Sequence, residues 1–173
     1  MATEKLEIFI ADPDMAGFAD AVQFDSQQPA GAFAGCNISM ANYQGAEADI
    51  RAGKFVDVLI TTHSPHMTDL RPNFNDGLPL ISLLREQETA RAQGDGPHKR
   101  TAIVLMTTMT PEPETCATLE RHDAVWMVPF EMNILGELRA VVNQALALVA
   151  IPELRVNGAP SPAEHRNFLD LIS

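Results

Sequence analysis

The fold is decided by residues 54–65, which read KFVDVLITTHSP. Between Val56 and Ile60 the stretch is apolar except at Asp57 and rich in β-branched residues, as is typical of a parallel strand buried on both faces. It predicts an apolar strand over residues 55–60 that passes into a polar turn and stops at Pro65. In open α/β sheets, chemistry takes place just beyond the carboxyl ends of such strands. The residues to examine are therefore 61–65, and none of them is acidic.

Further strands are predicted at residues 6–11, 37–40, 102–106 and 124–128. Helical patterns alternate with these strands, and the last helix carries the clearest apolar face, formed by Ile134, Leu138, Val141, Val142, Ala145 and Val149. Five strands that alternate with five helices imply right-handed crossovers and a parallel sheet covered on both sides. The sequence therefore predicts an α/β domain.

Capping residues predict where several helices begin. Asp14 is suited to cap the first helix and Asn133 the last. Thr110 and Pro111 suit the N-cap and the first position of the fourth helix. A helix is also predicted over residues 45–52.

Composition and charge narrow the class of protein. The chain has 173 residues, of which 46% are hydrophobic and 20% charged, as expected for a globular domain. A formal net charge of −11 argues against binding to nucleic acid. The longest apolar run, residues 145–151, is too short for a membrane span, and the charged residues within 4–7 do not fit a signal peptide. We expect a soluble cytoplasmic protein that binds neither nucleic acid nor membrane.

The two cysteines, Cys36 and Cys116, lie far apart and have no metal-binding spacing. We expect two reduced, largely buried thiols. His63, His66 and Asp69 invite a metal interpretation, but Pro65 interrupts them and no fourth ligand is evident, so ordinary loop histidines are favoured. A nucleophilic Ser64 or Thr62 is disfavoured, because neighbours on a strand point apart.

Beyond residue 149 the chain changes character. Prolines and Gly158 interrupt it, and then residues 161–164 form a capping box with proline at the first helical position. A short helix that includes Phe168 and Leu171 is predicted to follow, and it would need a surface to pack against. We expect one domain over residues 1–149 and a proline-containing tail with a short C-terminal helix over 150–173.

Five landmarks occur in order along the predicted strands: Asp12 after the first strand, the turn to Pro65 after the third, Asp76–Gly77–Leu78, Thr107 after the fourth strand, and Pro129–Phe130 after the fifth. Together they resemble the receiver domain of bacterial two-component response regulators over about residues 5–149. The resemblance implies a flavodoxin-like (βα)5 three-layer sandwich with parallel strand order 2-1-3-4-5 and a C-terminal extension.

Receivers phosphorylate themselves on a carboxylate after the third strand. Acids after the first strand hold Mg²⁺, and a hydroxyl and a lysine after the fourth and fifth strands bind the phosphoryl oxygens. Carried over by position, the resemblance implies a vestigial phosphorylation pocket made of Asp12, Pro13, Asp14, Thr61, Thr107 and Val128. Threonine replaces the nucleophile, proline a metal ligand and valine the lysine.

This sequence is therefore interpreted as a degenerate receiver that lacks the phosphoacceptor aspartate and takes no cofactor. Asp12 and Asp14 remain only weak metal candidates. Asp57 does not replace the missing acid, because it lies four residues before Thr61, roughly 13 Å away along an extended strand. Trp126 is one residue away from the receiver's aromatic switch position, so we expect it in the core or on the opposite face of the sheet.

The favoured function is a non-enzymatic signalling or scaffolding module that binds protein partners of a bacterial signalling pathway. The resemblance implies the surface of the fourth helix, fifth strand and fifth helix as the site of partner binding or of a homodimer. Its candidate residues are Met109, Trp126, Phe130, Met132, Phe168 and Leu171. The tail helix is expected to dock there or to be displaced from it.

Two alternatives remain open from the sequence. The vestigial pocket, lined by Asp12, Asp14, Thr61 and Thr107, could bind a small molecule or ion and act as a sensor. Alternatively, a hydroxyl such as that of Thr61 could be an unorthodox phosphoacceptor. The segment 66–75 is longer than the resemblance predicts, and it is interpreted as a lid, a partner surface or a tolerated insertion.

Overall fold

The computed structural model describes residues 5–11, 16–63, 77–92, 99–129 and 134–150. Its sheet comprises β1 (Glu7–Ala11), β2 (Asn37–Ala41), β3 (Val58–His63), β4 (Ala102–Thr107) and β5 (Ala124–Met127). All four strand pairings are parallel, and the order is β2-β1-β3-β4-β5. The predicted fold class and strand order are confirmed.

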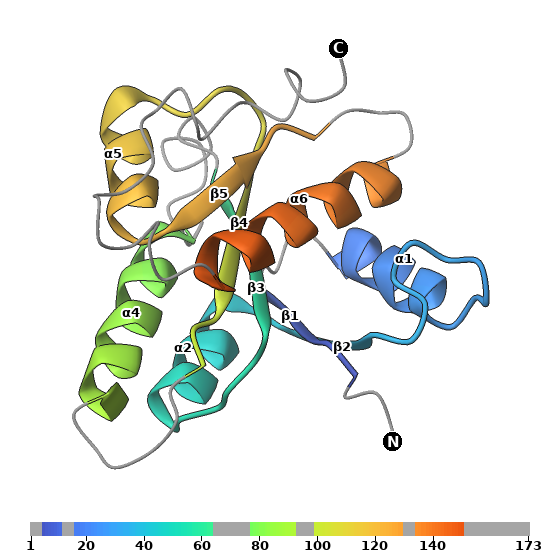
Figure 1. Ribbon diagram of the computed structural model, residues 1–173, viewed down its shortest axis with the longest axis horizontal. Coiled ribbons are helices and arrows are strands. Elements are labelled where there is room, and N and C mark those ends of the chain that lie inside the picture. Colours follow the sequence, from blue (N-terminus) through green and yellow to red (C-terminus); the bar gives the residue numbers. More distant parts are fainter. Residues whose placement is uncertain (1–4, 12–15, 64–76, 93–98, 130–133, 151–173) are drawn as a thin grey trace.

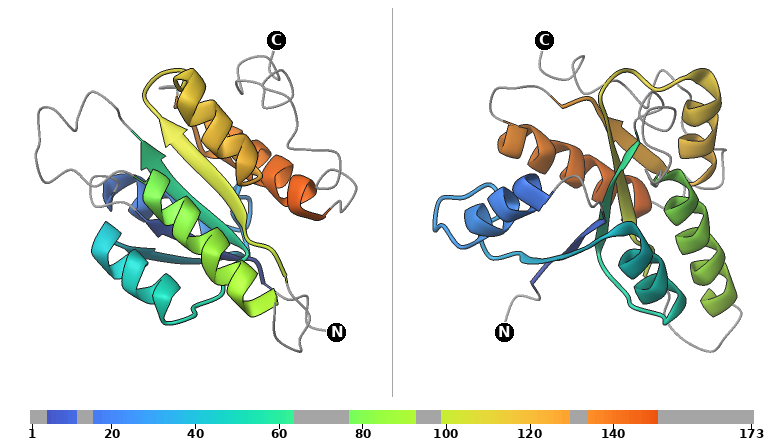
Figure 2. Two further views of the ribbon diagram at one scale, coloured as in Figure 1. Left: turned by 90° about the vertical axis from the view of Figure 1, so that its left-hand side faces the viewer. Right: turned by 180° about the vertical axis from the view of Figure 1, so that it is seen from behind.

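Two layers of helices cover this sheet. The helices are α1 (Ala16–Ser26), α2 (Tyr43–Arg51), α4 (Leu78–Ala92), α5 (Pro113–Arg121) and α6 (Ile134–Ala150). Helices α1 and α6 lie on one face, and α2, α4 and α5 lie on the other (Figures 1 and 2). Within the described part of the chain, no helix is long and apolar enough to cross a membrane.

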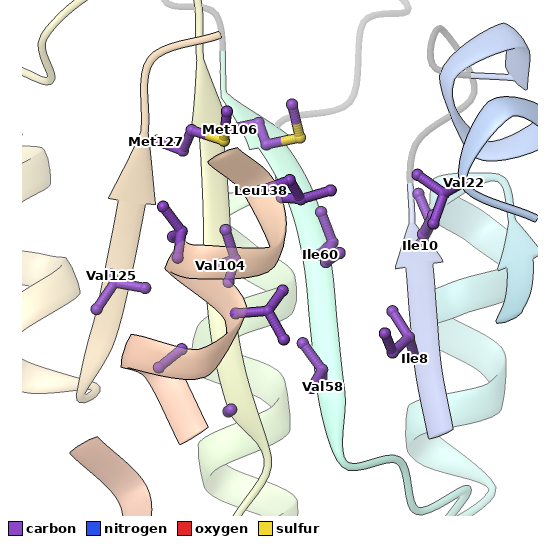
Figure 3. Close-up of a cluster of buried hydrophobic side chains, with 14 of the residues drawn as sticks. Ile8, Ile10, Val22, Val58, Ile60, Val104, Met106, Val125, Met127 and Leu138 are labelled. Carbon is purple, nitrogen blue, oxygen red and sulfur yellow. The ribbon is translucent and has the colours of Figure 1, made fainter. Parts of the chain in front are cut away.

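The central strand β3 supplies side chains to two separate cores. Val58 and Ile60 point toward α6, where they join the cluster that also contains Leu138 (Figure 3). Leu59 points to the other face and belongs to the second cluster. All three side chains are fully buried, and burial of such a side chain contributes about 1.5–3 kcal/mol. Burial on both faces explains why the strand is apolar at successive positions.

The second core lies between the sheet and the helices α2, α4 and α5. Trp126 of β5 belongs to it and is only 5% exposed, whereas its neighbour Val125 belongs to the first core. The predicted core placement of Trp126 on the face opposite to Val125 is therefore confirmed. Its inclusion among the residues of an exposed interaction surface is wrong, because the ring is enclosed by the second core.

Two predicted boundaries need correction. Strand β3 runs from Val58 to His63 rather than over residues 55–60, since residues 61–63 pair with residues 105–107 of β4. The predicted polar turn at residues 61–63 is thus still strand. Helix α5 begins at Pro113 with Glu112 as its N-cap, not at Thr110 and Pro111. A residue that precedes proline disfavours helical angles, and Glu112 is accordingly extended, with ψ at 157°.

The helix predicted over residues 45–52 begins at Tyr43 instead. Its N-cap is Asn42, whose side-chain oxygen accepts a hydrogen bond from the Gly45 N–H at 2.8 Å. The apolar face predicted for the last helix is confirmed, with Leu138, Val141, Val142, Ala145 and Val149 buried.

Several predicted features lie outside the described residues. They are the caps Asp14 and Asn133, the segment 66–75, and the tail beyond Ala150 with its short helix.

The amino end of β3 is held by a buried carboxylate. Asp57 precedes the strand, accepts a hydrogen bond from the Glu7 N–H at 2.8 Å and forms an ion pair with Lys99. Its side chain is 8% exposed. As predicted, Asp57 lies at the end of the sheet opposite to Thr61, so it anchors the strand and does not stand in for a phosphoacceptor.

Replacing this carboxylate should destabilise the fold. We expect Asp57→Ala to lower the free energy of unfolding by about 2–3 kcal/mol, because the Glu7 N–H loses its buried acceptor. Asp57→Asn should cost less, since its amide oxygen still accepts that hydrogen bond. Asp49→Ala, which removes an exposed partner of Lys54, serves as the control and should change stability by no more than about 1 kcal/mol. Urea unfolding checks all three; equal losses for Asp57→Ala and the control would contradict the anchoring role.

Candidate functional site

The site predicted from the sequence lies at the carboxyl edge of the sheet, where β1, β3 and β4 end. Strand register places Thr61 between Ala11 of β1 and Leu105 of β4, and it places His63 beside Thr107. Three of the six predicted pocket residues are described, namely Thr61, Thr107 and Val128. Asp12, Pro13 and Asp14 lie outside the described residues.

Thr61 occupies the position at which the resemblance expects a phosphoacceptor. Its side chain is 1% exposed, and its hydroxyl donates a hydrogen bond to the Ala11 carbonyl oxygen at 2.9 Å. The side chain thereby links the carboxyl ends of two neighbouring strands. Its proton is already committed to the backbone, so this threonine acts as a structural residue.

Gly77 covers Thr61. Its N–H donates to the Thr62 carbonyl at 2.9 Å, and its own carbonyl accepts from the Leu80 N–H at 3.1 Å, so it joins the end of β3 to the start of α4. A Cβ at this position would lie 2.5 Å from the Thr62 carbonyl oxygen and even closer to the Thr61 hydroxyl. Only glycine lets the backbone approach the strand this closely.

Thr107 is also engaged locally. It is 2% exposed, and its hydroxyl donates to the Met109 carbonyl at 2.5 Å, which shapes the turn after β4. The Met109 side chain beyond that turn is 45% exposed. A hydroxyl that already donates to the backbone is not available to donate to a phosphoryl oxygen without a rearrangement.

Val128 completes the described part of the pocket. It is half-buried and packs against the second core. At the three described positions, two hydroxyls already donate hydrogen bonds to backbone carbonyl oxygens and the third side chain is apolar. None of these side chains carries a charge near neutral pH. Among these three positions, nothing supplies the nucleophile or the cation that phosphoryl transfer requires.

The structure places the other candidate residues as follows. His63 lies within β3 and is 8% exposed, while His66, Ser64 and Asp69 lie outside the described residues. No group of three or more His, Cys, Asp or Glu side chains suited to a metal ion occurs among the residues that the structure describes.

The two cysteines are free, as predicted, but both are half-buried rather than largely buried. Cys36 Sγ accepts a hydrogen bond from Arg139 at 3.3 Å. Burial raises the pKa of the Cys116 thiol, and nearby Glu120 adds to that effect, so Cys116 stays protonated at neutral pH.

The predicted interaction surface is described only in part. Met109 is exposed and Trp126 is buried, whereas Phe130, Met132, Phe168 and Leu171 lie outside the described residues. The backbone role of Gly77 was missed from the sequence. The sequence feature that could have indicated this role is a glycine directly before an apolar helix. That feature is also common at ordinary helix starts, so it does not distinguish this position.

Comparison with known proteins identifies no family for this chain. No protein-family model matches the chain, and no curated protein matches it. Among solved structures, the chemotaxis response regulator CheY4 of Vibrio cholerae is similar, with 22% sequence identity and a TM-score of 0.48, over 84% of this chain and 99% of that chain. Values this low carry no argument about activity, so the class rests on the strand pairing: an α/β protein of flavodoxin-like order.

The close approach of Gly77 predicts a specific loss of stability. Gly77→Ala should lower the free energy of unfolding by about 1–3 kcal/mol, because the new Cβ overlaps the backbone of β3. Gly17→Ala on α1 is the matched control. Nothing lies within 4 Å of its added Cβ, so stability should stay constant or rise by up to about 1 kcal/mol. Thermal and urea unfolding measure both, and a neutral Gly77→Ala would show that the segment is not tightly packed.

Proposed function

We propose that this protein is a non-enzymatic signalling or scaffolding module that works by protein–protein contact, independently of aspartyl phosphorylation. The observation that carries the proposal is Thr61. It stands at the carboxyl end of the central strand, buried, with its hydroxyl bound to Ala11. A threonine cannot form the acyl phosphate on which the receivers resembled here depend.

The surroundings of Thr61 support the same proposal. Val128 has an apolar side chain at the position where receivers carry a lysine. The Thr107 hydroxyl donates a hydrogen bond to the Met109 carbonyl oxygen. Charge developed during phosphoryl transfer needs positioned cations. The three described pocket positions supply none.

The two alternatives from the sequence gain no support from these contacts. A sensor in the vestigial pocket needs free hydrogen-bonding groups, yet Thr61 and Thr107 are both buried and already donate to the backbone. A kinase that modifies Thr61 needs access to its oxygen, and that side chain is 1% exposed and lies beneath Gly77. Phosphorylation there would first require α4 to separate from β3.

For partner binding we propose the surface formed by α5, β5 and α6. These are the fourth helix, fifth strand and fifth helix of the sequence pattern, and β5 forms one edge of the sheet. All four residues of β5 are buried, so we assign the contacts with a partner to the exposed side chains around this strand. Met109, exposed at the carboxyl end of neighbouring β4, supplies an apolar contact. We infer protein partners of a bacterial signalling pathway, a homodimer through this face, and a cytoplasmic location.

Phosphorylation independence is tested by intact mass. The protein is incubated with a small acyl-phosphate donor and Mg²⁺, beside a control without metal, and its mass should remain unchanged. A Mg²⁺-dependent gain of one phosphoryl group that hydroxylamine removes would contradict the proposal, because it would identify an acidic acceptor.

The homodimer is tested by charge substitution at Met109. Sedimentation velocity over a concentration series should show reversible self-association, and Met109→Glu should weaken it by at least about tenfold, because a desolvated charge opposes the contact. Met40→Glu is the control, since Met40 is similarly exposed, at 38%, on the opposite edge strand β2. A strictly monomeric wild type, or equal effects of the two substitutions, would exclude a homodimer through this face.

A further inference from the structure

A groove of about 790 Å³ lies at the amino edge of the sheet, opposite to Thr61. One wall is α4, and the others are the segments that precede β3, β4 and β5. Its volume falls within the range of roughly 300–1,000 Å³ that is usual for small-molecule sites. The groove uses none of the vestigial pocket residues.

Positive charge gathers in this groove although the chain is acidic. Five of the chain's 12 Lys and Arg residues line it, namely Arg85, Arg91, Lys99, Arg100 and Arg121. Among the described lining residues there are two carboxylates, Glu86 and Glu88. Two further carboxylates that do not line the groove form ion pairs with it: Asp57 pairs with Lys99, and Asp123 pairs with Arg100. Cations therefore outnumber all of these carboxylates.

Arg85 is the most deeply placed of these cations. It is 5% exposed, and it donates from Nε to the His122 carbonyl and from Nη1 to the Thr101 carbonyl, both at 2.8 Å. Nη1 also contacts Glu88 at 2.7 Å. Nη2 is buried and has no hydrogen-bond partner among the described residues. Arg85 is therefore rigidly held and contributes a fixed positive charge to the groove that it lines.

Two further guanidinium groups share this property. Arg91 Nη2 and Arg100 Nε are buried and also lack a partner within the described ranges, although Arg100 Nη2 pairs with Asp123 at 2.6 Å. Buried donors are normally satisfied, so each exception asks for an explanation. These three nitrogens are closed to solvent, so they are not themselves contacts for a groove ligand, and the guanidinium groups act on an anion in the groove through their positive charge.

We propose that this groove binds a small organic phosphate. A phosphate presents at least three oxygens and up to two negative charges, which suits guanidinium groups from different segments better than the two oxygens of a carboxylate. Phe55 also lines the groove, is 41% exposed, and lies with its ring centroid 5.7 Å from Lys99 Nζ. Its ring provides an apolar surface for the organic part of the ligand.

The pKa of His122, which also lines the groove, should report whether a ligand is bound there. Burial lowers its pKa, and the positive charges of Arg85, Arg121 and Arg100 lower it further, against the opposing effect of Asp123. Its Nε2 lies 3.3 Å from the Ser82 hydroxyl on α4. A phosphate bound among these arginines offsets their positive potential, so it stabilises the imidazolium and moves the pKa of His122 upward.

The test is calorimetric titration of the full chain with phenyl phosphate, inorganic phosphate and benzoate at matched ionic strength. Phenyl phosphate should bind more tightly than inorganic phosphate, and benzoate should bind at least about tenfold more weakly than phenyl phosphate. Arg91→Gln and Arg121→Gln should each weaken phenyl phosphate binding by about threefold or more, while leaving the buried Arg85 in place. NMR titration of His122 should show a raised pKa in the complex.

Arg51→Gln is the matched control. It removes one cation from α2, outside the groove, where Arg51 pairs with Glu47 in solvent. The proposal is overturned if millimolar phenyl phosphate produces neither heat nor a shift of His122, or if Arg51→Gln weakens binding as much as Arg91→Gln. Equal affinity for benzoate would overturn the assignment to phosphate. Because this site does not include Thr61 or Met109, its failure would leave the proposed function untouched.

Discussion

Side chains of the central strand segment hold β1 at both of its ends. At the amino end, Asp57 accepts a hydrogen bond from the Glu7 N–H, and at the carboxyl end Thr61 donates to the Ala11 carbonyl. Between these two bonds, β1 and β3 pair in a single register. A slip by one residue would exchange the side chains of the two cores, so these polar contacts protect the arrangement on which both helix layers depend.

The sequence resemblance predicts a reactive carboxylate at the position of the same threonine. A carboxylate in place of Thr61 would face the Ala11 carbonyl without a proton to donate, in a site that is 1% exposed. Burying such a charge unpaired is costly. The close approach of Gly77 tightens the constraint, because it leaves no room above the strand. In this structure Thr61 therefore has a structural role, because its hydroxyl joins the carboxyl ends of β1 and β3.

Charge is distributed unequally between the two edges of the sheet. The described pocket positions at the carboxyl edge are uncharged, whereas the amino edge holds the ion pairs Asp57–Lys99, Arg85–Glu88 and Arg100–Asp123. Arg85–Glu88 is the most buried of the three, and a buried ion pair contributes little net stability because desolvation offsets the attraction between its charges. Net stability from these pairs is thus a weak reason for collecting cations at this edge of the sheet.

The apolar pattern of the sequence was sufficient to predict all five strands and the core position of Trp126, because the periodicity of strands and helices depends on neighbouring residues. The order of the strands was predicted from the resemblance. The apolar pattern was insufficient for the ends of elements. Residues 61–63 continue β3 because they pair with β4, and α5 starts late because Glu112 precedes a proline. Thr61 could be named from sequence, but its bond to Ala11 and its cover by Gly77 come from the fold. The amino-edge groove could not be predicted at all, since its lining comes from four segments between Phe55 and His122 that only the packed sheet brings together.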